Sequence, residues 1–374
     1  MNTIVLLSII CISCTSLLFI NRGNNRNMQR CLCFVFCFLT IFLGIRYMFG
    51  NDYINYLYQY EKVKEGVDYS YSWYESILYN ESASEPGWVL INRCFSSTSF
   101  AFLVFVLTIV EFYVLYKCIR KYVSPHHYWF SVYIFLINPY NMLTCISMMR
   151  QYLAMTIFLF AIRYIIERKI IKYMLLIVSA AFIHTSIIIL LPVYFIGYIN
   201  ASLFKKDIIR ICITIVVAFW YTIGAYYFGD IINELLGLSL LQRYDLYAGN
   251  DVKSISLGFS AVLYIFLFYL GISSIKNSTR EETILILITL IGVLIIPLGT
   301  SIPHITRMSF YFTYALIFVC PILLTKIRRR SVRFILVMLM MIFYINSLVS
   351  FIDSPINKEV YSTYHTIFSS IAEL

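Results

Sequence analysis

A small set of charged residues stands beside or inside long apolar stretches of this sequence. They are four arginines, an aspartate and a histidine: Arg46, Asp52, Arg150, His184, Arg243 and Arg307. Guanidinium groups bind phosphate oxygens through paired hydrogen bonds and keep their charge when water is removed. A histidine can accept a proton near neutral pH. These residue types suit a phosphate or pyrophosphate ligand next to a group that moves a proton.

The composition places these charges in a membrane protein. Of the 374 residues, 60% are hydrophobic and 13% are charged, whereas soluble proteins average about 45–50% apolar and 25% charged residues. Disordered chains are poor in apolar and aromatic residues, so the composition also excludes disorder. The net charge of +10 then reports orientation in the membrane. Because the basic residues are dispersed over several loops, we expect no nucleic-acid partner.

Apolar segments long enough to cross a bilayer recur along the chain. They are 3–20, 31–49, 98–118, 128–145, 147–166, 208–228, 257–275, 283–299, 308–325 and 333–352. A longer segment, 171–199, contains His184. If it crosses twice, as two short spans meeting near His184, the basic loops before and after it all lie on the cytoplasmic side. The sequence therefore predicts an all-α polytopic protein with about 12 transmembrane helices in a single membrane domain, 1–374.

The same orientation places the loops 50–86 and 229–256 outside. The first contains eight tyrosines between Tyr53 and Tyr79, as well as Trp73 and seven acidic residues. Aromatic faces beside hydroxyls and carboxylates suit sugar rings, and an interfacial aromatic belt is the other interpretation. The six charged residues named above also fall on this outer side. Glu111 and Arg163 lie nearer the inner side, and we interpret them as structural.

The sequence lacks the motifs of several enzyme classes. It has no P-loop, no H-E-x-x-H and no G-x-S-x-G, and it has no carboxylate cluster for Mg²⁺. Three cysteines, Cys31, Cys33 and Cys37, lack the paired spacing of a zinc site and are interpreted as residues of a membrane helix. We therefore expect no metal and no cofactor.

Several short motifs, taken in order, resemble the EpsG-like branch of Wzy-type polysaccharide (O-antigen) polymerases. They are Gly44-x-Arg46-Tyr47-x-x-Gly50-x-Asp52-Tyr53 with Tyr56, Glu85-Pro86-Gly87-Trp88, Arg150-Gln151 with Ala154, Phe182-x-His184-x-Ser186, Arg243-Tyr244 with Tyr247, and Arg307. They extend over roughly residues 40–320. The chain departs from the family pattern at Asn51, where a threonine or similar residue is usual. It also departs at its C-terminal end, where Pro355, Tyr361 and Tyr364 replace a Pro-Tyr ending.

The resemblance implies a multi-pass glycosyltransferase of the bacterial inner membrane, with a GT-C-like architecture and an active site on the periplasmic side. The implied donor is a growing glycan chain on undecaprenyl diphosphate, and the acceptor is a repeat unit on the same carrier. Partners implied by the resemblance are these two lipids, the bilayer and a chain-length regulator. The alternative function is a lipid-linked oligosaccharide flippase, which should carry charges at all depths of a central cavity and a two-fold repeat.

Within this hypothesis the candidate residues have separate roles. Arg150, Arg307 and Arg46 would hold the two pyrophosphates. His184 or Asp52 would accept the proton of the acceptor hydroxyl, with His184 favoured, and Asp52 would otherwise orient Arg46. The candidate catalytic residues are His184, Asp52 and Arg150, and the candidate substrate-binding residues are Arg46, Tyr53, Glu85, Gln151, Arg243, Tyr244, His304 and Arg307.

Overall fold

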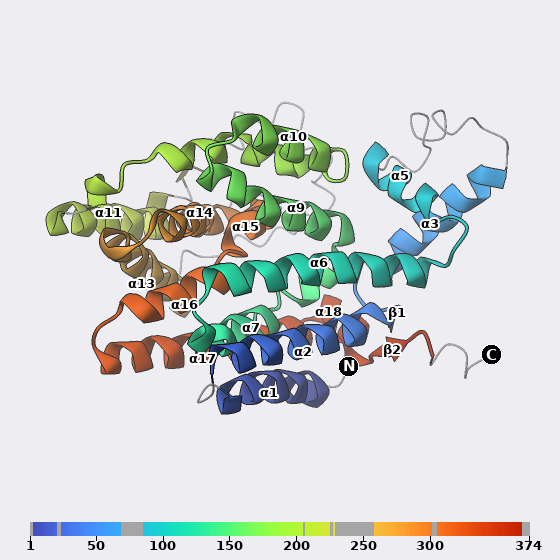
Figure 1. Cartoon of the computed structure of the whole chain (residues 1–374), viewed down its shortest axis with the longest axis horizontal. Helices are drawn as coiled ribbons and strands as arrows, with labels where there is room; N and C mark the ends of the chain where they lie inside the picture. Colours follow the sequence, from blue (N-terminus) through green and yellow to red (C-terminus); the bar gives the residue numbers. More distant parts are fainter. Residues whose placement is uncertain are drawn as a thin grey trace. The chain divides into compact units, whose positions relative to one another are not determined.

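The structure is a computed structural model that describes residues 3–20, 24–68, 85–204, 206–224, 227–228, 258–300 and 305–368. The described residues are mostly helical (Figure 1), and contacts divide the chain into two compact units. The first comprises Met1–Tyr194 with Tyr344–Leu374, and the second comprises Phe195–Phe343. The prediction of an all-α polytopic membrane protein is confirmed. Both units consist of apolar helices, and a single membrane domain stays a prediction.

The first unit contains the longer part of the chain. Its elements are α1 (Thr3–Ile20), α2 (Asn25–Gly44), β1 (Arg46–Tyr47), α3 (Tyr53–Asp68), α5 (Pro86–Cys94), α6 (Phe100–Tyr122), η1 (Pro125–His127), α7 (Tyr128–Ile137), α8 (Leu143–Ser147), α9 (Met149–Ile166), α10 (Ile170–Ala181), most of η2 (Thr185–Tyr198), the end of α17 (Arg330–Asp353), α18 (Pro355–Ser362) and β2 (His365–Thr366). The predicted outer loop 50–86 thus includes a helix, α3, and its residues 69–84 lie outside the described part of the chain.

Two antiparallel helices, α2 and α6, form the middle of this unit. The ring of Phe36 in α2 lies 6.2 Å from the ring of Phe112 and 6.0 Å from that of Tyr116, both in α6. Helix α9 packs beside α6, α10 packs on α9, and α1 packs on α7. The predicted span 128–145 ends early, at Ile137, because the residue before Pro139 is disfavoured in a helical conformation.

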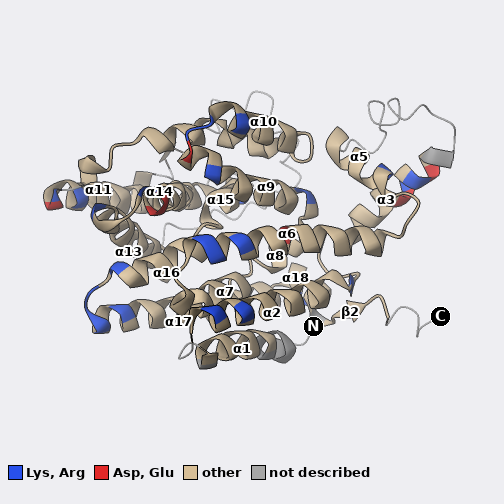
Figure 2. Cartoon of the chain, in the orientation of Figure 1, with Lys and Arg blue, Asp and Glu red and all other residues tan. Residues whose placement is uncertain are grey.

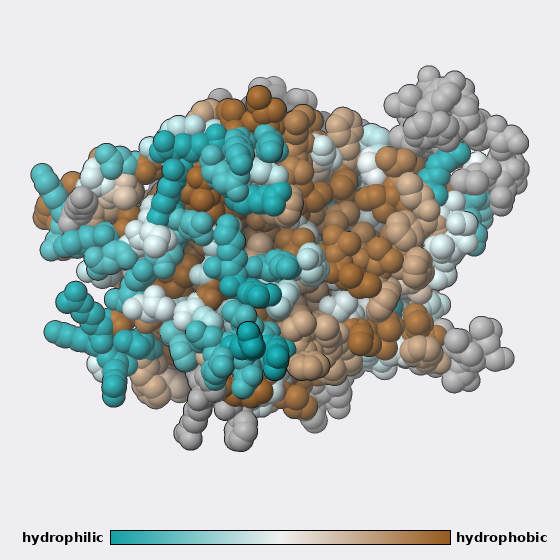
Figure 3. Space-filling model, in the orientation of Figure 1, coloured by the Kyte–Doolittle hydropathy of each residue, from teal (hydrophilic) through white to brown (hydrophobic). Residues whose placement is uncertain are grey.

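The outer surfaces of α2 and α6 suit a lipid environment. Large apolar side chains that point away from the packed core are exposed on both helices: Phe34, Phe38, Ile41, Phe102, Ile109 and Val110. Figure 3 shows apolar side chains over the middle of α6 and hydrophilic ones over its C-terminal end. Exposed apolar surface of this extent marks a membrane or partner contact, and lipid covers it without further partners.

The predicted number of spans is higher than the structure supports. Among the described residues, seven helices are long and apolar enough to cross a membrane, or eight if the bent pair α15–α16 is one span. The predicted span 128–145 is interrupted instead, since α7 ends at Ile137 and α8 begins at Leu143. The count of about 12 is therefore not confirmed, because breaks in the apolar runs shorten the helices.

Basic residues gather at the start of α2 and at the end of α6 (Figure 2). Arg26 and Arg30 start α2, and Lys117, Arg120 and Lys121 lie near the end of α6, which runs antiparallel to it. The hydrogen bond from Lys169 and the charges of Arg163 and Lys121 lower the pKa of Glu167, so the end of α9 lies there too. The candidate residues Asp52 and Arg150 belong to the opposite ends of these helices. Such an arrangement is typical of a protein that follows the positive-inside rule.

The long apolar segment 171–199 is broken where the sequence predicts it. Helix α10 ends at Ala181, and the 3₁₀ stretch η2 begins at Thr185. Pro192 lies inside η2 and has no backbone N–H, so the stretch cannot continue as a regular α-helix. The hydroxyl of Tyr173 donates a hydrogen bond to the carbonyl of Leu190 at 2.6 Å, which holds η2 against α10.

The second unit is a group of helices around α14. Its elements are the end of η2, η3 (Ala201–Phe204), α11 (Asp207–Phe219), the π-turn η4 (Trp220–Gly224), α13 (Phe259–Ser274), η6 (Ile275–Asn277), α14 (Arg280–Ile295), η7 (Ile296–Thr300), α15 (Ile305–Thr313), α16 (Leu316–Lys326) and the start of α17. Helix α14 begins with a capping box between Thr279 and Glu282. It packs against α13, α15 and α16. The predicted outer loop 229–256 lies outside the described residues.

The break at 182–184 leads to a prediction about topology. If 170–198 crosses the membrane twice, a reporter fused at Ser202 will lie on the cytoplasmic side, together with one fused at Ser124. A reporter at Ser96, between α5 and α6, will give the opposite signal. A periplasmic signal at Ser202 would show that the segment crosses once and that the predicted orientation of the later spans is wrong.

Candidate active site

The candidate site lies where the start of α5 meets the end of α10. The N–H of His184 donates to the carbonyl of Ala180 at 2.9 Å and closes the last turn of α10. The carbonyl of Phe182, one residue past the helix, accepts a hydrogen bond from the N–H of Gly87 in α5 at 2.8 Å. Helix ends leave such backbone groups without partners inside the helix. Here an N-terminal donor of α5 and a C-terminal acceptor of α10 satisfy each other.

The start of α5 is suited to this contact by its sequence. Pro86 occupies the first turn, where its fixed φ and missing N–H cost nothing. Gly87 follows, and a Cβ at this position would lie 2.7 Å from the carbonyl oxygen of Phe182. Only glycine allows this close approach without displacing backbone. Glu85 is the N-cap residue, yet its side chain makes no capping hydrogen bond, so the carboxylate is available to other groups.

The carboxylate of Glu85 lies between the guanidinium of Arg150 and the imidazole of His184. Its Oε2 forms an ion pair with Nη1 of Arg150, at the start of α9. Its Oε1 lies 3.3 Å from Nδ1 of His184. The backbone N–H and the hydroxyl of Thr185 both donate to Oε1 at 3.4 Å. The three charged side chains are 16–24% exposed, so the cluster is largely shielded but still open to a ligand.

These neighbours decide the charge of Glu85. Burial by itself would raise the pKa of the carboxyl, but the hydrogen bond from His184 and the charge of Arg150 outweigh it and lower the pKa to about 2. Glu85 is therefore a carboxylate at any physiological pH. A base with so low a pKa accepts protons poorly, so Glu85 acts as a fixed anion that orients its two partners.

Aromatic side chains of α3 and α5 pack next to the cluster. Trp88 is fully buried in α5, and its ring lies 5.4 Å from that of Tyr56 in α3. The guanidinium carbon of Arg150 lies 5.6 Å from the centre of the Tyr56 ring, a cation–π contact. Tyr56, Trp88 and Met149 belong to one core cluster. Arg150 is thus held on one side by an anion and on another by an aromatic face.

Asp52 is connected to α9 through its backbone. Its N–H donates to the hydroxyl of Ser147 at 3.1 Å, three residues before Arg150. The preceding turn is tight: Gly50 has φ +110°, and a Cβ there would lie 3.1 Å from the Cα of Ser147. The motif around Asp52 and the motif around Arg150 therefore pack together. Whether Asp52 acts in catalysis stays a prediction.

Arg46 lies in the core rather than beside Glu85. It is 3% exposed, and its Nη1 donates to the carbonyl of Leu43 at 2.7 Å and to the hydroxyl of Thr108 at 3.0 Å. Burial lowers the pKa of Arg46, and the charge of Glu111 in α6 opposes this effect. The structural interpretation of Glu111 agrees with this position. The predicted contact of Arg46 with pyrophosphate stays a prediction, and the contacts of Arg46 favour an internal role.

The other candidate residues are distributed over both units. Tyr53 is 1% exposed and packs edge-on against Phe100 at 5.2 Å, and burial raises its pKa to about 12. Gln151 is also buried. Arg307 lies exposed in α15 of the second unit. Three candidates, Arg243, Tyr244 and His304, lie outside the described residues.

The structure adds residues that sequence reasoning did not assign to the site. Thr185 donates to Glu85, and Tyr56 lies under Arg150. Both belong to the motifs quoted above, next to His184 and Asp52, so their proximity in sequence was a usable signal. The structure pairs the carboxylate of Glu85 with Arg150 and His184, and its assignment to substrate binding stays a prediction.

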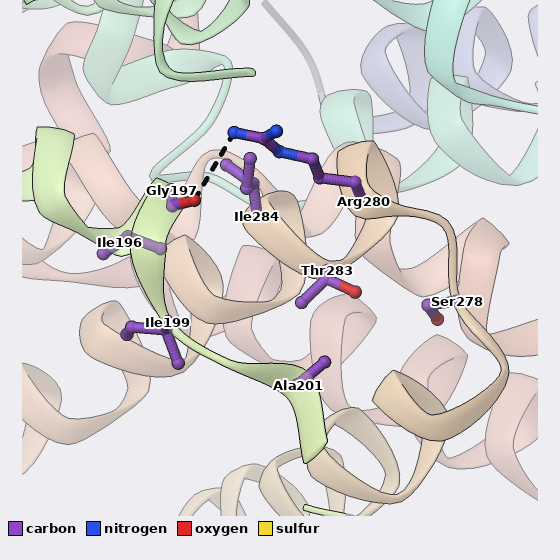
Figure 4. A pocket seen from close by; sticks show the side chains of 8 residues that line it. All are labelled: Ile196, Gly197, Ile199, Ala201, Ser278, Arg280, Thr283 and Ile284. Atoms are coloured by element: carbon purple, nitrogen blue, oxygen red, sulfur yellow. Dashed lines mark hydrogen bonds between the residues drawn. The ribbon is translucent and has the colours of Figure 1, made fainter. Parts of the chain in front are cut away.

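Two further observations concern possible ligands. Among the described residues, no group of three or more His, Cys, Asp or Glu side chains could hold a metal ion. A pocket of about 230 Å³ lies in the second unit, between the end of η2 and the start of α14 (Figure 4). Isoleucines and Thr283 line it, and Arg280 closes one side by donating to the carbonyl of Gly197 at 3.4 Å. This pocket has no acid–base pair, so the Glu85 cluster is the stronger candidate.

The close contact at Gly87 predicts a specific sensitivity. Replacing Gly87 by alanine should push α5 away from Phe182 and separate Glu85 from His184, so the stability of the fold should fall by roughly 1–3 kcal/mol. The control is Gly66→Ala in α3, where a Cβ would meet nothing within 4 Å and where alanine favours the helix. Equal thermal stability of the two variants would contradict the contact.

The low pKa of Glu85 predicts a pH-dependent contribution to stability. An unfolded glutamate titrates near 4.5, and the folded one near 2. The ion pair therefore stabilises the fold fully above pH 4.5, by on the order of 2 kcal/mol, and this contribution disappears as the pH falls toward 2. Wild-type protein should exceed Glu85→Gln in thermal stability at pH 7, and the difference should shrink at pH 3.5. A difference that does not change with pH would be inconsistent with this pairing.

No curated protein and no solved structure gives a significant match. A family model, that of the EpsG family, matches residues 29–365, which cover all the described members of the Glu85 cluster. The expected resemblance is thereby confirmed, and the chain belongs to the EpsG family.

Proposed function

We propose that this protein is a membrane glycosyltransferase of the polysaccharide-polymerase type. It would move a growing glycan chain from one undecaprenyl-diphosphate carrier onto a new lipid-linked repeat unit. Membership of the EpsG family supports the general class of a polysaccharide-polymerase-type membrane protein. The observation that carries the proposal is the cluster of Glu85, Arg150 and His184, which joins an acid–base group to an arginine at the end of a membrane helix.

His184 is the proposed general base. The acceptor hydroxyl attacks the anomeric carbon, forms the new C–O bond and gives its proton to His184. Glu85 lies at 3.3 Å from Nδ1, which leaves Nε2 for this proton transfer. The fixed negative charge of Glu85 stabilises the imidazolium that forms, as a buried carboxylate does in a catalytic triad. The break of the segment at 182–184 is what exposes this histidine.

Arg150 is the proposed partner of the leaving group. As the bond between the anomeric carbon and the carrier oxygen breaks, the lipid diphosphate gains negative charge. A guanidinium has five N–H donors, so Arg150 can keep its ion pair with Glu85 and still offer donors to phosphate oxygens. Because Glu85 and Tyr56 already fix it, little reorganisation is needed in the transition state. The predicted contact of Arg307 with the second pyrophosphate stays a prediction.

The expected location is the inner membrane, with the site on the periplasmic face. The argument comes from charge: basic residues gather at the start of α2 and at the end of α6, and the Glu85 cluster belongs to the opposite end. Basic loops favour the cytoplasm. Lipid-linked acceptors at the outer leaflet would then reach the cluster from the membrane, next to the exposed apolar surface of α6. A chain-length regulator would bind in the same region.

Reconstitution tests the proposal directly. Purified protein in lipid nanodiscs, given lipid-linked repeat units and no ATP, should form polymer. His184→Ala should slow polymer formation by about 10²–10⁴-fold, the usual contribution of a general base. Arg150→Ala should slow it by about 10²–10³-fold, and Arg307→Ala is expected to weaken it as well. The control for loss of a surface charge is Lys64→Ala, which changes an exposed lysine of α3.

The outcomes separate the competing functions. Long chains in both Arg150→Ala and His184→Ala would show that the catalytic assignment is wrong. Translocation of single repeat units by the wild-type protein, without polymer, would indicate a flippase.

A further inference from the structure

The C-terminal segment 355–367 is packed against the motif that precedes Asp52. In Figure 1, β2 lies beside β1, although the two strands are separated by most of the chain. The strands pair antiparallel, with Arg46 opposite Thr366 and Tyr47 opposite His365. The N–H of Ile367 also donates to the carbonyl of Ile45 at 3.0 Å. The segment therefore lies along residues 45–47 as a backbone ladder.

Side chains extend this contact toward Asp52. Tyr364 stacks on Phe42 at 4.6 Å, and Phe49 packs edge-on against Tyr364 at 5.1 Å and against Tyr361 at 5.2 Å. Asn51 donates its Nδ2 hydrogen bond to Oδ1 of Asn357 at 3.0 Å. Asn357 is 9% exposed and is itself fixed, because its Nδ2 donates to the carbonyl of Phe351 at 3.0 Å. Residues of the C-terminal segment 355–367 thus hold the turn 48–52 in place.

The same segment also contacts the residues that precede Arg150. The hydroxyl of Tyr361 donates to the carbonyl of Leu143, the first residue of α8, at 3.2 Å. Helix α8 ends at Ser147, whose hydroxyl accepts the hydrogen bond from the Asp52 N–H. Helix α9, with Arg150, begins two residues later. The C-terminal segment therefore contacts both the turn that contains Asp52 and the helix, α8, that ends at Ser147.

This turn needs an external support. Met48 has φ 49° and Gly50 has φ 110°, so the backbone adopts left-handed conformations, one of them at a residue with a side chain. The conformation of Met48 is costly for a residue with a side chain and persists only where surrounding contacts impose it, whereas glycine adopts a positive φ readily. The contacts that surround it come from Ser147 on one side and from segment 355–367 on the other.

We propose that Asn357 and Tyr361 are positioning residues for the transfer reaction. They hold the turn 48–52 and α8 against each other and so fix the start of α9, where Arg150 meets Glu85. Asn357 and Tyr361 act through the turn 48–52 and through α8, so their effect on the reaction is indirect. The kinetic part of this inference rests on the proposed function. The structural part, the link from residue 357 to the Asp52 N–H, does not.

The first test measures that link without the reaction. In Asn357→Ala, amide hydrogen exchange of the peptide that covers residues 45–53 should become faster, because the Asp52 N–H loses its fixed geometry. Lys358→Ala changes the neighbouring, exposed residue of the same helix and should leave this exchange unchanged. Unchanged exchange in Asn357→Ala would overturn the proposal.

The second test measures the reaction for each folded molecule, with the folded fraction taken from the monodisperse peak in size-exclusion chromatography. Asn51→Ala, Asn357→Ala and Tyr361→Phe should each lower the rate constant of polymer formation by about tenfold, with KM for the acceptor unchanged, because a small misplacement of catalytic groups is expensive. The double variant of Asn51 and Asn357 should be no slower than the slower single one. Leu32→Ala, a buried residue of α2, should lower stability and leave this rate constant unchanged.

The results distinguish the two proposals. If wild-type protein forms no polymer, the proposed function is wrong, while faster exchange in Asn357→Ala still supports the link. If wild-type protein is active and Asn357→Ala has the same rate constant for each folded molecule, the positioning role is wrong and the proposed function is unaffected. Multiplying effects in the double variant would likewise overturn action through the Asn51–Asn357 pair.

Discussion

The carboxylate of Glu85 can remain charged in a largely shielded place because Arg150 and His184 lie on either side of it. A carboxylate removed from water needs compensation of this kind. The three side chains come from three separate elements, so their contacts also determine how α5, α9 and the end of α10 meet. The hydrogen bond from Gly87 to Phe182 sets the approach of two of these elements. The charge of Glu85 and the packing of these helix ends thus depend on the same contact.

This contact depends in turn on the ends of helices. Glu85 immediately precedes α5, Arg150 lies in the first turn of α9 and His184 follows α10. Helix interiors in a membrane satisfy their own backbone groups, whereas helix ends must find partners elsewhere. Polar side chains gather at such ends for the same reason. The C-terminal segment 355–367 follows the same rule. It forms hydrogen bonds with the turn 48–52 and with the short helix α8, which do not satisfy these groups internally.

Sequence reasoning succeeded where a residue's neighbours along the chain determine its setting. His184 interrupts an apolar segment that is too long for one span, and the structure breaks at that place. Arg46 illustrates the opposite case. Its position after an apolar run looks like that of Arg150, yet it is buried against Thr108 and near Glu111, which lie about 60 residues away in the sequence. Only packing distinguishes an arginine that supports the core from one that faces a ligand.

By itself, the sequence determined the membrane class, the family and the short list of charged residues, because composition and motif order are local properties of the chain. Tertiary structure decided which of these residues meet. It joined Glu85 to Arg150 and His184, and it placed Asn357 beside Asn51 across about 300 residues. In the described part of the chain it gives seven or eight long apolar helices, so the predicted count of about 12 is not confirmed. The physical reason is that ion pairs and hydrogen bonds between helix ends depend on distances in space, which hydropathy along a chain does not encode.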